Sequence, residues 1–571
     1  MIKHRVLIFS IAMLFLFVLI MARVGQLALL QYDTLSSAAT EQRVRNFDYY
    51  QYARGDIKDC QGRNLTNIYE HCLVILPAIA ANYIDIIAQE LSLVLDYDEK
   101  LIKDKLQLGS SQNITPFILK TGLSKQQCKN IEQMKLPGVM ITEQAARYGV
   151  ERIAAHIIGY VQPVGEKGKY SGVSGLEQQY DDQLANRYDK QLQTIVDANG
   201  SNGNNAVSVI TNYNVKYNSL QLTINRDYQQ IAEQAFSEFG YSGACVIMDP
   251  DNGDLLAVVS APTFDPYCWE DAVGDAYVNK AFSLFAPAST FKTLLSIAAL
   301  DVKANMDVAA LTDGDTSAVD ESDAEVFTPA AVFNCDGSYS FGDGHTVSCA
   351  GGVGHGQVDL ARALALSCNC YFVALGQQLG GETIKEYADL LGLYDLTVGG
   401  YDLPSYSRED FLDFNSEHMG ALANASLGEA GVNISPVQEA VLMSACVNGG
   451  FRVWPRLVSG IIDEQGKIIK ETPAVSAEKV VDSNISETVR LMLIDTVENG
   501  TAAAAKGKYT TTGGKTGSSE SGGVWFSGFA PADNPDFVIV VFVQNGTAGG
   551  VEAAAIFKYI VDNVVLLNGQ V

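Results

Sequence analysis

The chain has 571 residues, of which 47% are hydrophobic and 18% charged, and its formal net charge is −27. This length predicts two or three domains with cores of their own, and the composition excludes a disordered chain. The negative charge argues against nucleic acid as a partner, because phosphates require a surface rich in Lys and Arg.

The N-terminal segment predicts a membrane anchor. The residues KHR at 3–5 precede an uncharged apolar run from Val6 to Ala22, which is at the short end for a membrane span and can be extended by apolar residues beyond Arg23. A cleaved signal peptide begins in the same way, but the end of this run lacks a small-x-small cleavage site. We expect residues 1–5 in the cytoplasm, a span over 6–24 and the rest outside the cytoplasm, because positive charge stays inside.

The region up to residue 218 has mixed patterns. The segment ILPAIAANYIDIIAQELSLVL (75–95) has helical spacing. A Gly- and Asn-rich segment, DANGSNGNNAVSVITNYN (197–214), predicts a loop or linker. We place the main boundary just after it, so that residues 25–218 form a first domain of mixed helices and strands and 219–571 a second domain.

The second half predicts an α+β domain. It begins with a short strand and a helix that ends at Gly240, followed by a hairpin whose two β-rich runs flank the turn residues DPDNGD (249–254). Three further strand-like runs lie between 509 and 546, and a helix at 551–565 closes the chain. A helical centre between early and late strands predicts a sheet that combines both ends of this half.

The stretch FAPASTFKTLLS (285–296) places Ser289 three residues ahead of Lys292 at a predicted helix start. Helix geometry puts both on one face, so the Lys292 amine can reach the Ser289 hydroxyl. The free N–H groups of the first turn favour an oxyanion, and burial near a second cation can make a Lys a neutral base. The spacing alone is weak, because Ser is a common N-cap and the polar segment at 476–479 has the same spacing.

A second motif follows an apolar helix-like run. Ser367 and Asn369 in ALALSCNCYF are predicted to lie on a tight loop, where they can supply a proton relay and an amide contact to a substrate backbone. The Ser-x-Asn pattern also occurs at 111–113, and Lys-Thr-Gly, the pattern of the third motif below, also occurs at 120–122. Neither of these copies follows a Ser-x-x-Lys. The specific signal is therefore the ordered set of three motifs.

The third motif is Lys515-Thr516-Gly517 in TTTGGKTGSSES. On a strand, Lys515 and Gly517 point to one side and Thr516 to the other, and Gly517 lets a substrate chain approach the strand edge. The backbone N–H of Ser518, together with that of Ser289, is then available as an oxyanion donor.

The ten Cys form no CxxC pair, which argues against zinc ribbons and thioredoxin-like sites, and the six His are scattered. We therefore expect neither a metal nor a cofactor. Cys335 and Cys349 flank a Gly-rich loop, and they are either a disulfide in an oxidising space or buried free thiols.

Nearly the whole chain resembles a class B penicillin-binding protein, a membrane-anchored peptidoglycan D,D-transpeptidase. ARGDIKDCQGRNLTN (53–67), RYGVERIAAHIIGYV (147–161) and SGVSGLEQQYDDQL (171–184) resemble pedestal motifs of this family. MDPDNGDLLAVVSAPTFDP, SLGEAGVNISPVQEAVLMSACVNGG and GGVWFSGFAP resemble signatures of its transpeptidase domain. The departures are Cys60-Gln61 for Arg-Asn, Ala288 for Gly, and KTGSS for Lys-Thr-Gly-Thr-Ala, and none removes a catalytic group.

The resemblance implies an elongated mixed α/β pedestal over 25–218 and a transpeptidase domain over 219–571, with a mainly antiparallel sheet flanked by helices. It also implies crosslinking of peptidoglycan stem peptides through a serine acyl-enzyme, in cell-wall synthesis during division, elongation or sporulation. β-Lactams are the implied inhibitors, acylating the same serine. The implied catalytic residues are Ser289 as nucleophile, Lys292 as base, Ser367 as proton relay, Asn369 as a backbone contact and Lys515. The implied substrate-binding residues are Thr516, Gly517 and Ser518, where Lys515, Thr516 and Ser518 hold the terminal carboxylate.

Three other functions fit parts of the pattern. A β-lactamase would hydrolyse the acyl-enzyme, but such enzymes are usually shorter and lack a pedestal of this size. A signalling receptor would need further membrane spans or a cytoplasmic effector, and five residues precede the predicted span. A structural role, in which the pedestal binds and activates a membrane glycosyltransferase of the SEDS type, can coexist with catalysis.

Overall fold

The structure is a computed structural model. It describes residues 2–31, 44–95, 97–112, 116–149, 151–164, 170–185, 187–195, 208–212, 218–312, 332–341 and 344–569.

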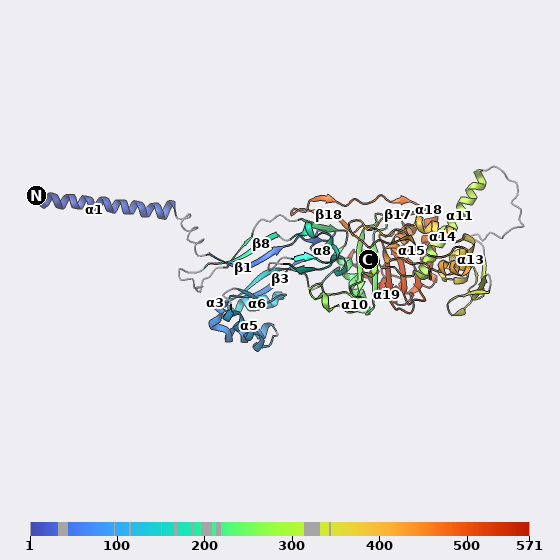
Figure 1. The fold of residues 1–571 in the computed structure, drawn as a ribbon, viewed down its shortest axis with the longest axis horizontal. Helices are drawn as coiled ribbons and strands as arrows, with labels where there is room; N and C mark the ends of the chain where they lie inside the picture. The colour runs from blue at the N-terminus through green and yellow to red at the C-terminus, as the bar shows by residue number, and fades with distance from the viewer. Residues whose placement is uncertain are drawn as a thin grey trace.

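The N-terminal helix stands apart from the rest of the molecule (Figure 1). Helix α1 (Ile2–Gly25) continues into a π-helical turn, η1 (Gln26–Leu30). The stretch Leu7–Leu29 has a mean hydropathy of 2.6 and is long and apolar enough to cross a membrane. The apolar helix thus continues past Arg23, as the residues beyond it allowed.

A three-stranded antiparallel sheet follows α1. Strand β8 (Arg187–Ile195) pairs with β1 (Val44–Ala53) on one side and with β9 (Ser208–Asn212) on the other. The linker predicted over 197–214 is therefore wrong at β9, where the β-branched run VIT (209–211) favours a strand and β8 supplies its partner. The rest of that predicted linker lies outside the described residues.

The pedestal also contains a lobe in which α-helices pack with a small sheet. The segment at 75–95 is helical from residue 77 onward, as predicted. Alternate residues of the central strand, Leu73 and Ile75, pack against Ile87 and Leu91 of the following helix. The elements of this lobe are β3 (Thr66–Ile75), α3 (Pro77–Ala80), η2 (Ala81–Tyr83), α4 (Ile84–Leu95), α5 (Glu99–Gln112), β4 (Phe117–Lys120), α6 (Lys125–Met134) and β5 (Val139–Tyr148).

One sheet joins the pedestal to the second half. The pedestal strand β2 (Ile57–Lys58) pairs in parallel with β10 (Ser219–Leu222). Strand β10 also pairs with β18 (Val458–Ile462), and β18 with β19 (Ile468–Glu471), both antiparallel. The two halves therefore share a hydrogen-bonded sheet.

The second half is built on a five-stranded antiparallel sheet in the order β12-β11-β23-β22-β21. This confirms the predicted α+β fold, in which strands from both ends of the segment form one sheet. Because side chains alternate along a strand, Val246 and Val540 enter the core on one face, and Ile247 and Val541 enter the core on the other. The strands are β11 (Gly243–Met248), β12 (Leu255–Ala261), β21 (Gly513–Ser518), β22 (Val524–Ala530) and β23 (Phe537–Val543).

Helices cover both faces of this sheet. Helices α10 and α19 contact one face, and α17 lies against β11, β22 and β23 on the other, while α18 contacts β21. The longer α-helices of the second half are α10 (Arg226–Phe239), α11 (Lys292–Thr312), α12 (Leu360–Ala365), α13 (Asn369–Leu379), α14 (Gly381–Leu390), α16 (Met419–Ser426), α17 (Pro436–Val447), α18 (Ser483–Asn499) and α19 (Glu552–Leu567). The three motif segments meet beside the β21 edge.

Candidate active site

The Ser289 turn is a 3-10 helix, η5 (Ala288–Phe291), that leads directly into α11 at Lys292. Ser289 is half-buried and Lys292 is fully buried. The residue before Ser289, Ala288, has a left-handed φ of 52°, and its N–H donates to the carbonyl of Gly428 at 2.8 Å. The predicted helix start is confirmed, and it begins with a conformation that is uncommon for a residue with a side chain.

The Lys292 amine points towards the second motif. Its Nζ donates to Asn369 Oδ1 at 2.7 Å, to the Ser367 carbonyl at 3.0 Å and to Ser367 Oγ at 3.3 Å. The Ser289 hydroxyl makes no hydrogen bond with another described residue, Lys292 included. The second motif thus holds the amine of Lys292, which follows Ser289 by three residues.

Ser367 lies in the short connection between α12 and α13, as predicted, with a left-handed φ of 55°. Lys515 Nζ donates to the Ser367 hydroxyl at 3.0 Å. The Ser367 oxygen therefore lies between two amines, those of Lys292 and Lys515, that come from distant parts of the chain.

Burial controls the charge of both amines. It lowers the pKa of Lys292 to about 8. Burial also lowers the pKa of Lys515, and the nearby charge of Lys292 lowers it further. Two ammonium groups sharing one hydroxyl repel each other, so the pair favours a state in which one amine is neutral and can accept a proton.

Strand β21 shows the predicted alternation. Lys515 faces Ser367, whereas the Thr516 hydroxyl is 3.1 Å from that of Thr501 on the other side. A Cβ at Gly517 would lie 2.8 Å from the Pro287 carbonyl oxygen, so Gly at this position lets the strand approach the Ser289 turn.

The remaining motif residues lie at the ends of their elements. Asn369 begins α13, and its Nδ2 donates to the Ser348 carbonyl at 3.0 Å. Ser518 ends β21, and its Oγ accepts from the Gly549 N–H at 2.9 Å. The structure thus brings the three motif segments together around Ser367.

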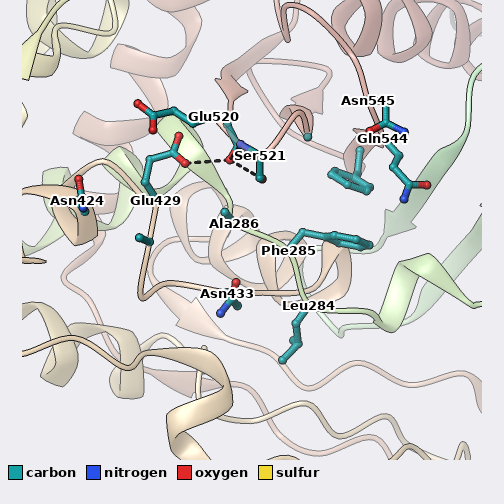
Figure 2. A pocket seen from close by; sticks show the side chains of 14 residues that line it. Leu284, Phe285, Ala286, Asn424, Glu429, Asn433, Glu520, Ser521, Gln544 and Asn545 are labelled. Atoms are coloured by element: carbon teal, nitrogen blue, oxygen red, sulfur yellow. Dashed lines mark hydrogen bonds between the residues drawn. The ribbon is translucent and has the colours of Figure 1, made fainter.

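A cavity of about 550 Å³ (Figure 2) is lined by Ala286, three residues before Ser289, and by Ser519, which follows Ser518. In it, Ser519 Oγ donates to Glu429 at 2.8 Å, and burial raises the pKa of the Glu429 carboxyl. Glu429 was not predicted as a site residue, although its SLGEAG segment was one of the quoted signatures. The lining residues are Leu284, Phe285, Ala286, Asn424, Glu429, Ala430, Asn433, Ser519, Glu520, Ser521, Gly523, Phe542, Gln544 and Asn545.

Two open questions from the sequence have structural answers. The second Ser-x-x-Lys, at 476–479, ends in the short strand β20 (Glu478–Lys479), where the Lys479 amine donates to the Gly449 carbonyl at 2.7 Å. Cys335 and Cys349 are buried and form no disulfide with each other, and their sulfurs lie 3.6 Å apart.

Comparisons with known proteins identify both halves of the chain. The penicillin-binding protein transpeptidase domain matches residues 243–562, more than half of the chain, and the penicillin-binding protein dimerisation domain matches residues 50–217.

Similar proteins cover most of the chain. Stage V sporulation protein D of Bacillus subtilis is 28% identical over 97% of this chain and 84% of its own length. The peptidoglycan D,D-transpeptidase MrdA of Acinetobacter baumannii is 24% identical over 97% of this chain and 86% of its own. The crystal structure of the D,D-transpeptidase domain of a peptidoglycan glycosyltransferase from Eggerthella lenta aligns with a TM-score of 0.56 and 25% identity, over 76% of this chain and 94% of that one. The chain therefore belongs to the class B penicillin-binding proteins and is a transpeptidase.

Proposed function

We propose that this protein crosslinks peptidoglycan stem peptides through an acyl-enzyme on Ser289. The observation that carries the proposal is the convergence of Lys292, Ser367, Asn369 and Lys515 beside the Ser289 turn. A half-buried serine at the start of a helix, next to an amine whose pKa is lowered by burial, is the arrangement that nucleophilic catalysis requires.

In the first step, Ser289 Oγ attacks the carbonyl carbon of the penultimate D-Ala, and its proton passes to Lys292 Nζ. The backbone N–H groups of Ser289 and Ser518 bind the oxyanion. The C–N bond to the terminal D-Ala then breaks, and the departing nitrogen receives a proton through Ser367. An ester on Ser289 and a free D-Ala are the products.

In the second step, an amine from a neighbouring stem peptide attacks the ester carbonyl carbon. The attacking amine loses its proton to Lys292 Nζ, the base of the first step. An amide forms, and Ser289 Oγ regains a proton. We propose that Lys515, Thr516 and Ser518 hold the donor's terminal carboxylate, with Gly517 allowing close approach. Asn369 contacts the peptide backbone.

The cavity at Glu429 fits the acceptor strand. Its amide side chains offer hydrogen bonds to a peptide, and the carboxyl of Glu429 attracts an amine. The cavity is lined by Ala286, three residues before Ser289, and by Ser519, which follows Ser518, and this supports a position beside the acylation site. We assign the acceptor amine to this cavity.

The test of the acyl-enzyme uses the full chain in detergent. Wild-type protein incubated with penicillin should gain the mass of one penicillin, and Ser289→Ala should gain none. The matched control is Ser476→Ala, which removes the serine of the other Ser-x-x-Lys and should be acylated like wild type. Covalent labelling of Ser289→Ala would overturn the assignment.

We also propose how the protein lies at the membrane. Residues 1–5 are cytoplasmic, 6–24 form the anchor, 25–218 the pedestal, and 219–571 the transpeptidase domain outside the cytoplasm. The apolar, unburied helix near the N-terminus supports a single-pass anchor in the cytoplasmic membrane. Protease added to intact spheroplasts should digest the transpeptidase domain and leave a cytoplasmic N-terminal tag intact.

The pedestal is the proposed binding surface for a SEDS-type membrane glycosyltransferase. Large apolar side chains are exposed on α4 and α5 of the pedestal lobe, with Leu93 78% and Leu108 60% accessible. Leu93→Asp should reduce co-purification with the glycosyltransferase from detergent, whereas Leu491→Asp, at an exposed apolar position on α18, should not. Equal co-purification of Leu93→Asp and wild type would contradict this docking surface.

A further inference from the structure

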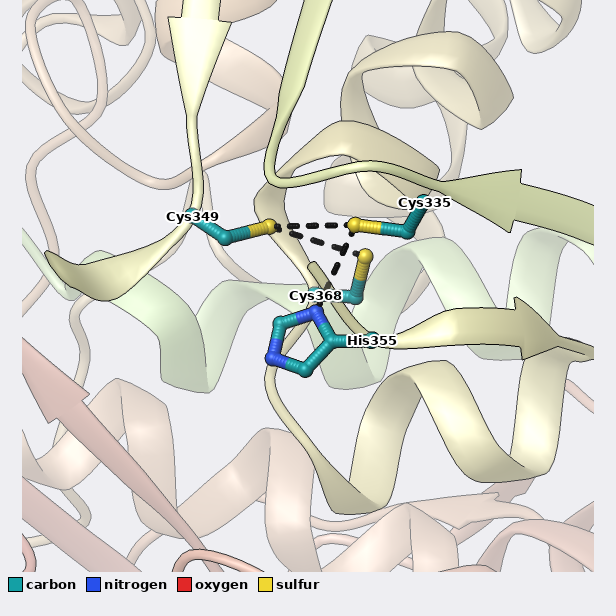
Figure 3. A group of neighbouring side chains, drawn as sticks. All are labelled: Cys335, Cys349, His355 and Cys368. Atoms are coloured by element: carbon teal, nitrogen blue, oxygen red, sulfur yellow. Dashed lines mark hydrogen bonds between the residues drawn. The ribbon is translucent and has the colours of Figure 1, made fainter. Parts of the chain in front are cut away.

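Four potential metal ligands converge behind the Ser367–Asn369 loop (Figure 3). They are the sulfurs of Cys335, Cys349 and Cys368 and a ring nitrogen of His355, and all four ligand atoms lie within 4.8 Å of one another. The three sulfurs are buried, with residue exposures of 1%, 3% and 0%. We propose that this cluster, which we call the Cys3His site, binds one structural zinc ion.

The distances match tetrahedral coordination. Sulfurs bound at 2.3 Å to one zinc lie about 3.8 Å apart, and a sulfur and a nitrogen about 3.6 Å apart. The Cys335 sulfur lies 3.6 Å from that of Cys349 and 3.5 Å from His355 Nδ1, and the sulfurs of Cys349 and Cys368 are 3.7 Å apart. Three thiolates and one imidazole form a standard ligand set for structural zinc.

The ligands come from four separate segments. Cys335 ends β13 (Phe333–Cys335), and Cys349 follows β15 (His345–Ser348). His355 precedes β16 (Gly356–Val358), and Cys368 is the N-cap residue of α13. One ion would therefore connect strands β13, β15 and β16 to the start of helix α13.

The strands that carry these ligands are short. Strands β13 and β16 form one two-stranded ribbon, and β14 (Ser338–Phe341) pairs with β15 in another. Ribbons of three or four residues per strand are marginal without further support. Cys335, Cys349 and Cys368 belong to the large hydrophobic core of this half, and Phe341, Val373 and Ala423 form a separate small cluster. Metal binding would supply folding free energy here, as it does in small zinc domains.

One ligand of the proposed ion, Cys368, belongs to the Ser367–Asn369 loop, which we call the catalytic loop. Cys368 separates Ser367 from Asn369, and Cys349 follows Ser348, whose carbonyl accepts a hydrogen bond from Asn369. Zinc would thus fix both partners of that bond and hold Ser367 at its left-handed φ. Four protein ligands leave no open coordination position, so the ion positions the loop and takes no part in acyl transfer.

Binding has a defined proton balance. Three S–H bonds are replaced by three Zn–S bonds with release of three protons, and His355 binds as neutral imidazole through Nδ1 with its proton on Nε2. A fourth cysteine, Cys370, has its sulfur 3.4 Å from that of Cys349. We assign Cys370 as a thiol that donates to the Cys349 sulfur, outside the ligand set.

The test measures metal in the full chain, purified in detergent without chelator. Wild type should contain about one zinc per chain, and Co2+ in its place should give thiolate-to-cobalt absorption. Cys335→Ser and His355→Ala should lose the metal. Cys370→Ser should keep it, as should Cys446→Ser, a fully buried cysteine on α17 whose thiol donates to the Leu442 carbonyl at 3.4 Å, a bond that a serine can replace.

Several results would overturn the proposal. Wild type without zinc or cobalt uptake would do so, as would a Cys335–Cys349 disulfide in non-reduced peptides. Loss of metal in Cys370→Ser with retention in His355→Ala would overturn the Cys3His ligand set. If the ligand variants do not fold, wild-type stoichiometry and chelator-dependent exposure of three thiols still decide the question.

The metal and the acyl-enzyme are tested separately. Ser289→Ala should retain zinc, because Ser289 is not a ligand. Removing zinc from wild type should lower the melting temperature and slow penicillin acylation. Unchanged acylation and melting after complete removal would show that the ion does not position the catalytic loop.

Discussion

At the scale of single residues, the central feature is that one hydroxyl, that of Ser367, accepts hydrogen bonds from two buried amines. In the free protein, burial and the charge of Lys292 both favour the neutral form of Lys515. A substrate carboxylate bound at Lys515 would favour the protonated form there. The resulting positive charge would then lower the pKa of Lys292 and release it as the base.

This arrangement predicts the pH dependence of acylation. With a pKa of about 8, Lys292 is protonated at lower pH and cannot accept the Ser289 proton. The second-order rate of penicillin acylation at subsaturating drug should therefore rise up to tenfold per pH unit below about pH 8 and level off above it. Lys292→Arg, which keeps a positive charge at all these pH values, should abolish acylation. A rate that falls between pH 6 and pH 8 would contradict the assignment of a neutral amine as base.

At the scale of elements, the contact between β21 and η5 depends on Gly517. An added Cβ would lie 2.8 Å from the Pro287 carbonyl oxygen and 3.2 Å from Thr290 Cγ2, so the strand or the Ser289 turn must move. Since a displacement of about 1 Å can cost about 100-fold in rate, Gly517→Ala should slow acylation strongly. Gly399→Ala is the control, because its nearest atoms, at 3.2 Å, belong to the flexible Arg456 side chain. Stopped-flow acylation rates that are equal in the two variants would rule out this packing role.

Helix α17 carries a buried carboxyl behind the Ser289 turn. Burial raises the pKa of Glu439 to about 8, against a smaller opposing effect of the hydroxyls of Ser527 and Thr290. The folded state therefore keeps a proton that the unfolded state loses above about pH 4.3, and the free energy of unfolding falls as pH rises from there to about 8.

Glu439→Gln should remove this pH dependence. The melting temperature of the variant, relative to wild type, should increase steadily between pH 5 and pH 8. Glu464→Gln, at an exposed position, corrects for the loss of one negative charge. Differential scanning fluorimetry at three pH values measures the trend, and parallel curves for wild type and Glu439→Gln would show that Glu439 is not protonated in the fold.

At the scale of the whole molecule, features that depend on neighbouring residues could be predicted from the sequence. Contacts between distant segments could not. The β11–β12 hairpin, the helix start at Ser289 and the alternation along β21 follow from neighbouring residues, so the sequence predicted them. The Cys3His site was not predicted, because its ligands are separated by 13, 5 and 12 residues and match no short zinc motif. The pairing of β8 with β1 likewise depends on tertiary contacts that no local pattern contains.

The junction between pedestal and transpeptidase domain shows the same dependence on tertiary contacts. Three signatures that resembled pedestal motifs meet in one buried ion cluster at Glu177, which is fully buried. Arg54 Nε and Arg147 Nε each lie 2.6 Å from a different oxygen of Glu177, and Arg54 also pairs with Asp181 at 2.7 Å. The cluster lies next to β2, the pedestal strand that pairs with β10.

Glu177→Gln should destabilise the pedestal, because it leaves two buried guanidinium groups without their shared carboxylate. Breaking a buried ion pair costs about 3–5 kcal/mol, which predicts a melting temperature several degrees below wild type. The same change in the exposed Glu151–Arg226 pair, where Glu151 is 49% accessible, should cost about 1 kcal/mol or less. Because the acylation site is built from other segments, Glu177→Gln should still bind penicillin covalently at low temperature while its pedestal becomes sensitive to protease. Equal melting temperatures for the two variants would show that the Glu177 cluster does not stabilise the pedestal.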